Sequence, residues 1–353
     1  MPRWLPTRAR RPLLALLVPL VLVLVAAVAV VGVRVWQDHS RTELERAVDL
    51  APSGSERFAW TDWAGVRREL DAPEGDLDAL LDLGFDADLT SASSMVDSAA
   101  FLDDLFGFSP ENVEWELLAQ GESGAVALLQ MPDSVDLEAL GDGLEGLGFT
   151  RPDEEDGVWV GGEELIADLA PGSGISPQFQ NLAIDADEHL VIGSDNADYL
   201  ATALDGDRGV DGVEQVVGRA GEPLSAVAYA DDRACTALSM AQADGDDQAE
   251  ADELVAAAGE VNPLTGFLLG SLPDGTARVV MSFEDDDQAR RNADARSTLA
   301  SGPAPGQGGG FADRFELGRV EADGEVVTME LEPVEGSFIV SDLGSGPVLF
   351  ATC

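Results

Sequence analysis

The feature that most constrains this chain is a long uncharged stretch near its start. The 21 residues from 13 to 33 contain no charged side chain. As a helix rising 1.5 Å per residue, such a stretch is about 31 Å long, close to the ~30 Å thickness of a bilayer's hydrocarbon core. The sequence therefore predicts a transmembrane signal anchor over residues 12–36, and the rest of the chain is interpreted relative to it.

The charges on either side of the anchor predict its orientation. No acidic residue occurs among the first 37 positions, and four arginines precede the apolar stretch: Arg3, Arg8, Arg10 and Arg11. Because basic flanks stay in the cytoplasm, we expect residues 1–11 to be a cytoplasmic tail and the C-terminal region to be extracytoplasmic. The alternative is a cleaved signal peptide ending at Ala27-Val28-Ala29. That site lies inside the apolar run, which favours a retained anchor.

The exported region is strongly acidic. All 20 basic residues of the chain are arginines, and residues 47–353 hold 13 of them against 64 Asp and Glu, a formal charge of −51. Such a charge repels the phosphates of nucleic acids and anionic lipid head groups. The sequence therefore excludes a nucleic-acid partner and leaves the N-terminal helix as the contact with the lipid bilayer. The hydrophobic content of 45% argues against a disordered acidic tail.

Cys235 and Cys353 are the only cysteines. In an oxidising compartment an even pair predicts a disulfide, which here would hold the extreme C-terminus; the alternative is two free thiols.

The periodicity of the exported region predicts an α+β fold with an antiparallel sheet. Hairpins with turns at 121–124 and 273–275 are each followed by a helix and a strand, so the order hairpin, helix, strand recurs around residues 113–161 and 264–321. This recurrence suggests two similar ββαβ halves, with chance recurrence as the alternative. We expect a stalk and linker over 37–57, one half over 58–209 and the other over 210–353. Residues 346–353 are predicted to be a last strand.

No stretch of the sequence carries a recognisable catalytic motif. It contains no GxSxG, HExxH, P-loop or GxGxxG pattern, and His189 is the one histidine beyond the stalk, which contains His39. Two acidic runs, 205–212 and 244–253, offer oxygen ligands for calcium, but neither has EF-hand spacing, which favours solvated loops. The sequence therefore predicts no catalytic, cofactor-binding or metal-binding residue and no cofactor.

Two segments carry a family resemblance: RFAWTDWAGVRREL at 57–70 and SDLGSGPVLFATC at 341–353. Together with the arginine-flanked anchor, they make the chain similar to uncharacterised single-pass extracytoplasmic proteins of high-GC actinobacteria. The resemblance implies a location in the cell envelope and assigns no activity.

Three functional hypotheses follow from these observations. The leading one is a membrane-anchored, acidic extracytoplasmic protein that is not an enzyme and that binds an envelope protein partner or has a structural role in the envelope. The second is an acidic domain that binds calcium or another cation. The third is a cell-envelope hydrolase that uses a carboxylate pair.

Overall fold

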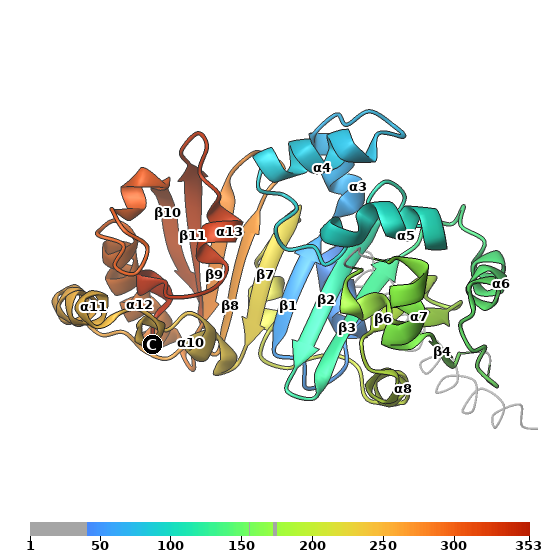
Figure 1. The fold of residues 1–353 in the computed structure, drawn as a ribbon. Coiled ribbons are helices and arrows are strands. Elements are labelled where there is room, and N and C mark those ends of the chain that lie inside the picture. The colour runs from blue at the N-terminus through green and yellow to red at the C-terminus, as the bar shows by residue number, and fades with distance from the viewer. Residues whose placement is uncertain (1–40, 155, 172–174) are drawn as a thin grey trace, which may run out of the picture. The chain divides into compact units, whose positions relative to one another are not determined.

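The strands of the described part of the chain join in one antiparallel sheet (Figure 1). The structure is a computed structural model that describes residues 41–353 apart from 155 and 172–174. Within these residues the sheet has eleven strands in the order β10-β11-β9-β8-β7-β1-β2-β3-β6-β5-β4. The strand bounds are β1 Arg57–Thr61, β2 Trp115–Gly121, β3 Gly124–Gln130, β4 Val158–Val160, β5 Asn181–Asp185, β6 Leu190–Ser194, β7 Ser225–Ala230, β8 Gly266–Ser271, β9 Ala277–Ser282, β10 Phe315–Asp323 and β11 Val326–Pro333.

Strand β1 occupies the middle of this sheet. It pairs with β2 on one side and with β7 on the other, so Phe58 lies opposite Ala119 and also opposite Ala228. Its side chains alternate between two faces. We call the side that carries Phe58 and Trp60 face A, and the opposite side face B.

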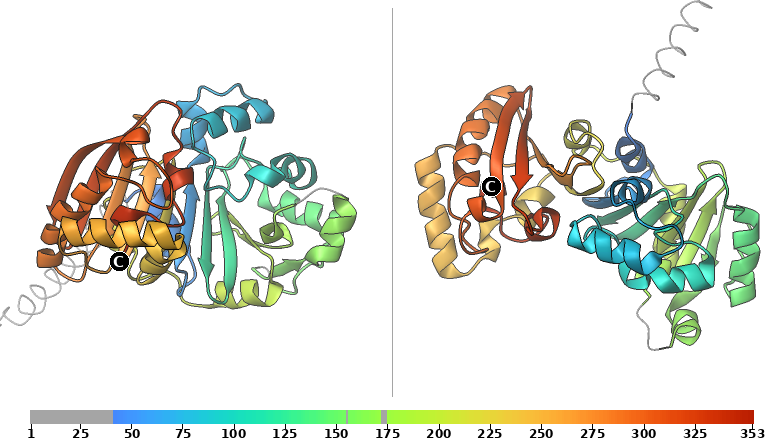
Figure 2. Two further views of the ribbon diagram at one scale, coloured as in Figure 1. Left: turned by 60° about the vertical axis from the view of Figure 1, so that its left-hand side comes forward. Right: turned by 90° about the horizontal axis from the view of Figure 1, so that it is seen from above.

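Helices cover both faces. Three pack on face A: α2 Glu43–Leu50, α8 Ala197–Asp205 and α9 Glu214–Val217. Face B is covered on one side of β1 by α3 Trp63–Glu69, α4 Leu77–Asp86, α5 Ala99–Phe106, α6 Leu137–Leu147 and α7 Gly162–Leu169. On the other side it is covered by α10 Arg233–Ala237, α11 Gly245–Ala258, α12 Asp286–Ala300 and α13 Ile339–Leu343. Figure 2 shows α12 against the β10–β11 hairpin, with α11 outside it.

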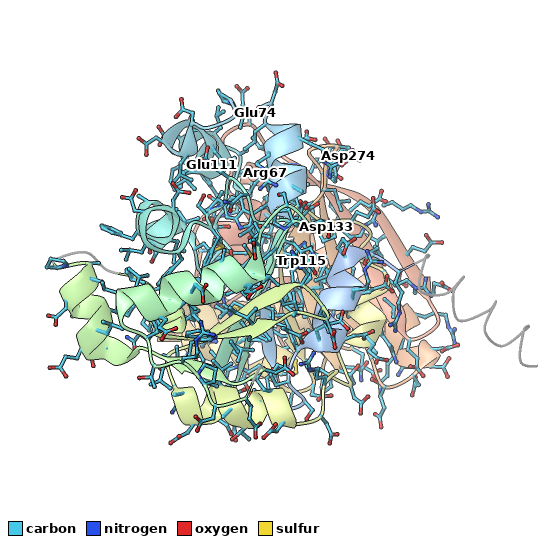
Figure 3. All side chains as sticks on the ribbon, turned by 90° about the vertical axis from the view of Figure 1, so that its right-hand side faces the viewer. Arg67, Glu74, Glu111, Trp115, Asp133 and Asp274 are labelled. Atoms are coloured by element: carbon cyan, nitrogen blue, oxygen red, sulfur yellow. A yellow bond between two sulfur atoms is a disulfide. The ribbon has the colours of Figure 1, made fainter. Side chains whose placement is uncertain are left out.

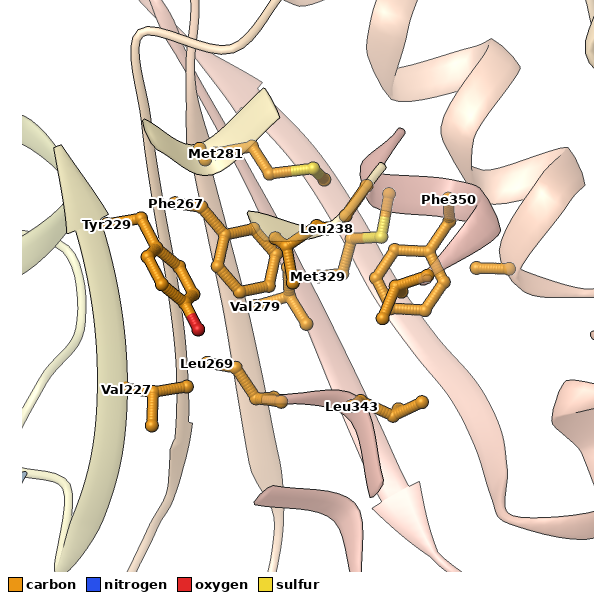
Figure 4. Packing of buried hydrophobic residues seen from close by; sticks show 14 of the residues in the cluster. Val227, Tyr229, Leu238, Phe267, Leu269, Val279, Met281, Met329, Leu343 and Phe350 are labelled. Carbon is orange, nitrogen blue, oxygen red and sulfur yellow. The ribbon is translucent and has the colours of Figure 1, made fainter. Parts of the chain in front are cut away.

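The core under α10 and α13 shows how face B is filled. Tyr229, Phe267 and Val279 from three neighbouring strands meet Leu238 and Phe350 from the segments above them (Figure 4). The Tyr229 hydroxyl donates to the carbonyl of Gly344 at 2.7 Å, so this buried aromatic residue has its polar atom satisfied. Contiguous apolar packing of this kind supplies most of the free energy of folding.

The α+β class expected from the sequence is confirmed, and both recurring segments have the expected order of elements. One runs β2, β3, α6, β4 and the other β8, β9, α12, β10. The predicted anchor, the cytoplasmic tail and His39 lie outside the described residues. Among those that are described, no helix is both long and apolar enough to cross a bilayer.

Two local expectations differ from the structure. Residues 346–353 are not a strand: Leu349–Ala351 form a single 3-10 turn, because the chain here turns inward and buries Phe350 instead of pairing with a sheet edge. The part of the expected stalk from residue 44 onward packs on face A, where Leu44, Ala47 and Val48 are buried. Three apolar residues at i, i+3 and i+4 make this a packing helix, despite its charged neighbours.

The C-terminus is held by a disulfide and by a buried arginine. Cys235 in α10 and Cys353 are bonded, with their Cα atoms 5.3 Å apart and a sequence separation of 118. Arg296, fully buried on α12, donates to the carbonyls of Phe350 at 2.7 Å and Thr352 at 2.9 Å. Burial lowers the pKa of Arg296 to about 9, so its guanidinium still carries a full charge at neutral pH. The partial negative charges of backbone carbonyl oxygens stabilise this positive charge.

We expect Cys353→Ser to lower the free energy of unfolding by about 2–5 kcal/mol, because a long loop of the unfolded chain is then no longer closed. Urea unfolding followed by tryptophan fluorescence measures this change. The double variant Cys235→Ser/Cys353→Ser and the reduced natural chain should lose the same amount. A single variant as stable as the oxidised natural chain would contradict the structural role of the bond.

Candidate functional site

A row of polar side chains crosses the middle of the sheet on face B. Ser271, Ser225, Thr61 and Glu116 lie directly opposite one another on β8, β7, β1 and β2. Opposite residues of antiparallel strands share a face, so their side chains are neighbours. Thr61 Oγ1 and Ser225 Oγ are buried and have no hydrogen-bond partner within the described part of the chain. Unsatisfied hydroxyls are uncommon in a core and mark this row as unusual.

Glu116, at one end of the row, is fully buried and hydrogen-bonded at both oxygens. Its Oε1 accepts from the backbone N–H and the hydroxyl of Ser94, both at 2.6 Å. Its Oε2 accepts from Ser93 Oγ at 2.6 Å and from Trp63 Nε1 at 3.2 Å. Burial raises the pKa of this carboxyl, while these donors act in the opposite direction. A carboxylate enclosed in this way cannot touch a substrate, and it holds the segment around Ser93 against the sheet.

A second carboxylate, Asp88, connects the segment that contains Ser93 and Ser94 to α13, which also covers face B but lies on the β7 side of β1. Asp88, which follows α4, accepts from the N–H of Val340 at 2.6 Å and from the hydroxyl of Ser341 at 2.5 Å. These groups open α13, so a side chain from residues 58–209 caps a helix from residues 210–353. Asp88 has φ +54°, a left-handed conformation that Asp tolerates better than most residues. The segment 88–94 is therefore held at both ends: Glu116 binds Ser93 and Ser94, and Asp88 binds the start of α13. It spans the junction between residues 58–209 and residues 210–353.

A hollow of about 230 Å³ lies at this junction. One wall comes from the ends of α3 and α4, and the other from the β8–β9 hairpin, the end of β11 and the start of α13. We call it the junction hollow, and its lining is Glu69, Leu70, Ala87, Asp88, Leu89, Leu224, Ser271, Leu272, Gly275, Pro333, Ser337 and Ile339. Most of this lining is apolar, and Ser271 connects it to the polar row.

A wider cleft of about 500 Å³ lies on the other side of α3. Arg67, Arg68, Glu74 and Glu111 are among its lining residues, and Figure 3 shows Arg67, Glu74 and Glu111 close together. Arg67 donates to the carbonyls of Pro110 and Val113 at 2.6 and 2.7 Å, so it mainly holds that loop. Burial lowers the pKa of Arg67 and raises that of Glu111. Two arginines and two carboxylates make this cleft close to neutral, in contrast with the acidic surface around it.

The residues singled out from the sequence have mainly structural roles. His189 adopts φ +56° in the turn before β6, and its Nε2 lies 3.0 Å from the carbonyl of Pro132. The acidic run 244–253 forms the start of α11, where Asp244 caps the helix through the N–H groups of Asp246 and Asp247. In the other run Arg208 pairs with Asp185 at 3.3 Å. Across residues 41–353, leaving out the four that are not described, no group of three or more His, Cys, Asp or Glu is arranged to hold a metal ion.

Sequence reasoning did not single out Asp88 or Glu116. Glu116 carried one signal, because it is a charged residue inside the otherwise apolar run Trp115–Leu118. Such a residue is found in a buried strand only when hydrogen-bond donors surround it. Asp88 carried no signal, because its partners lie more than 250 residues away.

We expect Glu116→Gln to change how stability depends on pH. The folded-state pKa of Glu116 lies above its ordinary value of 4.5, so the folded chain binds this proton more tightly than the unfolded chain does. Its contribution to stability is therefore full below about pH 4.5 and is lost as the pH rises through the raised pKa. Unfolding free energies of the natural chain and of Glu116→Gln, measured from pH 4 upward, should show a difference that falls with pH. Glu122→Gln, in the exposed turn of the same hairpin, should give a constant difference, and a constant difference for Glu116→Gln would refute this linkage.

Comparison with known proteins adds limited information. No family model and no curated protein matches the chain. Two solved structures, described as crystal forms I and III of TP0453, align with TM-scores of 0.36 and identities of 8% and 9%. The first alignment covers 87% of this chain and 97% of TP0453; the second covers 84% and 96%. A TM-score this low does not establish a shared fold.

Proposed function

We propose that this chain is a membrane-anchored extracytoplasmic protein with a non-enzymatic binding role in the cell envelope. The disulfide between Cys235 and Cys353 is the observation that carries this proposal, because such bonds persist in oxidising compartments and are rare in the cytosol. The four arginines ahead of the apolar stretch support the same direction of export.

The geometry of the junction hollow supports a binding role. An apolar hollow with a few polar groups is a common form of binding site. Glu116, a carboxyl whose pKa is raised by burial, is sealed from solvent and acts as a hydrogen-bond acceptor within the core. The arrangement therefore favours recognition over acid–base chemistry.

We also propose that residues 58–209 and 210–353 arose by duplication. The shared order of hairpin, helix and strand supports this, as does the antiparallel pairing of β1 with β7, the strand that opens each part. On this view the junction hollow lies where two copies of one unit meet.

A protease added to intact cells should degrade the region 44–353 while a cytosolic marker protein stays whole. Thiol-reactive reagents, applied after denaturation, should label Cys235 and Cys353 only once the chain has been reduced. Immunoblots with antibodies against the exported region and mass shifts of the alkylated protein measure both effects. Protection of the region in intact cells together with free thiols would overturn the proposed location.

The full chain, purified in detergent from cells that have not been crosslinked, should retain a specific envelope protein through washes at high salt. Salt resistance is the criterion because a charge of −51 attracts basic proteins without specificity, and salt screens that attraction. A protein that is released at high salt would not count as the partner. Turnover of envelope polymers by the purified chain would contradict the non-enzymatic assignment.

A further inference from the structure

Two aromatic rings that are close in sequence to lining residues of the junction hollow contact each other, one from each wall. Phe85 on α4 is 66% exposed, and its ring centroid lies 5.6 Å from that of Phe338, just before α13. Val334, in the turn that leads to Phe338, is 43% exposed. Ala87 to Leu89, which follow Phe85, and Ser337 and Ile339, which flank Phe338, line the hollow itself. We call Phe85, Val334 and Phe338 the rim.

The rim residues are close in sequence to the apolar lining of the hollow. Single exposed apolar side chains are normal on protein surfaces, but these three lie within two residues of lining residues of a cavity whose walls include Leu70, Leu224 and Leu272. Aromatic residues beside a small apolar pocket are typical of the sites that dominate the energy of protein–protein contacts. A cavity of about 230 Å³ has room for one bulky side chain rather than for a large cofactor.

Unpaired carboxylates surround the rim. Glu69 lines the hollow, Asp82 and Asp86 lie on α4 with Phe85, and Glu335 follows Val334. In the part of the chain that the structure describes, none of these four forms an ion pair. Arg314, whose carbonyl accepts from the N–H of Val334, directs its guanidinium to Asp342 and to the carbonyls of residues 307 and 308. The rim is therefore apolar at its centre and negative around it.

This charge pattern selects among the possible occupants. A second copy of the chain would bring the same carboxylates against themselves in a two-fold contact, which like charges oppose. An anionic lipid surface is repelled for the same reason. A polypeptide segment with one bulky apolar side chain and arginine or lysine beside it complements both the apolar hollow and the carboxylates near it.

We propose that the junction hollow is the docking site for such a basic partner segment, whose apolar side chain enters the hollow and packs against the contacting rings of Phe85 and Phe338. This proposal rests on the binding role proposed above and specifies its site and partner chemistry. The flanking basic residues pair with Glu69, Asp82, Asp86 and Glu335. Because the two rings belong to different parts of the sheet, the site is complete only when both parts are folded together.

The test uses the full chain in detergent micelles and a synthetic peptide with one tryptophan between two pairs of arginines. Fluorescence anisotropy of the labelled peptide measures its affinity. We expect Phe85→Ala to weaken binding roughly tenfold or more, as truncation of a central aromatic contact does. Leu83→Ala is the matched control, since Leu83 is 40% exposed on the same helix but does not neighbour Phe338, and it should leave the affinity unchanged. Both side chains are well exposed, so neither variant should fail to fold.

Two further peptides separate the apolar and charged contributions. Replacing tryptophan by alanine should abolish binding, and replacing the arginines by glutamates should do the same. Failure of the arginine–tryptophan peptide to bind the natural chain, or equal binding to Phe85→Ala, would overturn the docking site. So would self-association, or flotation with phosphatidylcholine vesicles, that Phe85→Ala abolishes, because either would assign the rim to another occupant.

The outcome can be separated from that of the broader proposal. If the natural chain captures an envelope partner and Phe85→Ala captures it equally well, the binding role stands and the docking site is wrong. If the natural chain captures no partner at high salt, the binding role itself fails.

Discussion

The pairing of β1 with strands on both sides is the interaction on which the rest of the structure depends. Five residues, Arg57–Thr61, join the strands of residues 113–194 to those of residues 225–333 in one ladder. The pairing also sets which side chains share a face, so it places Trp60 in one core and Ala59 in another. Trp60 Nε1 donates to the carbonyl of Pro223 at 2.9 Å, which ties the entry to β7 to this strand. The polar row and the junction hollow both exist because β1 brings their two sides together.

The excess of acidic residues is accommodated partly by helix capping. Aspartates accept hydrogen bonds from the exposed N–H groups at the start of five helices, where the helix dipole also favours a negative charge. These caps are Asp62, Asp76, Asp136, Asp244 and Asp285. Asp88 and Glu116 extend this use of carboxylates to contacts between distant segments. The carboxylates around Phe85 and Val334 cap no helix and form no ion pair among the described residues, and they support the inference about a basic partner.

Local patterns predicted the individual elements well where periodicity and capping agreed. The hairpin turns at 121–124 and 273–275 follow from residue types alone. The last segment did not, because Val348, Leu349 and Phe350 form an apolar run that suits a buried turn as well as a strand. Arg296 favours the buried turn because it donates hydrogen bonds to the carbonyls of Phe350 and Thr352. The residues around this run do not indicate that Arg296 is its partner.

The sequence by itself determined the α+β class, the acidity of residues 47–353 and the presence of a cysteine pair that can form a disulfide, because composition and short-range periodicity report on residues close together in the chain. Only the tertiary structure decided that one sheet contains every strand of the described residues, that Glu116 is a buried acceptor, and that Phe85 faces Phe338. Those outcomes depend on contacts across as many as 253 residues. Packing between distant segments fixes such contacts, and local periodicity does not report which distant segments meet.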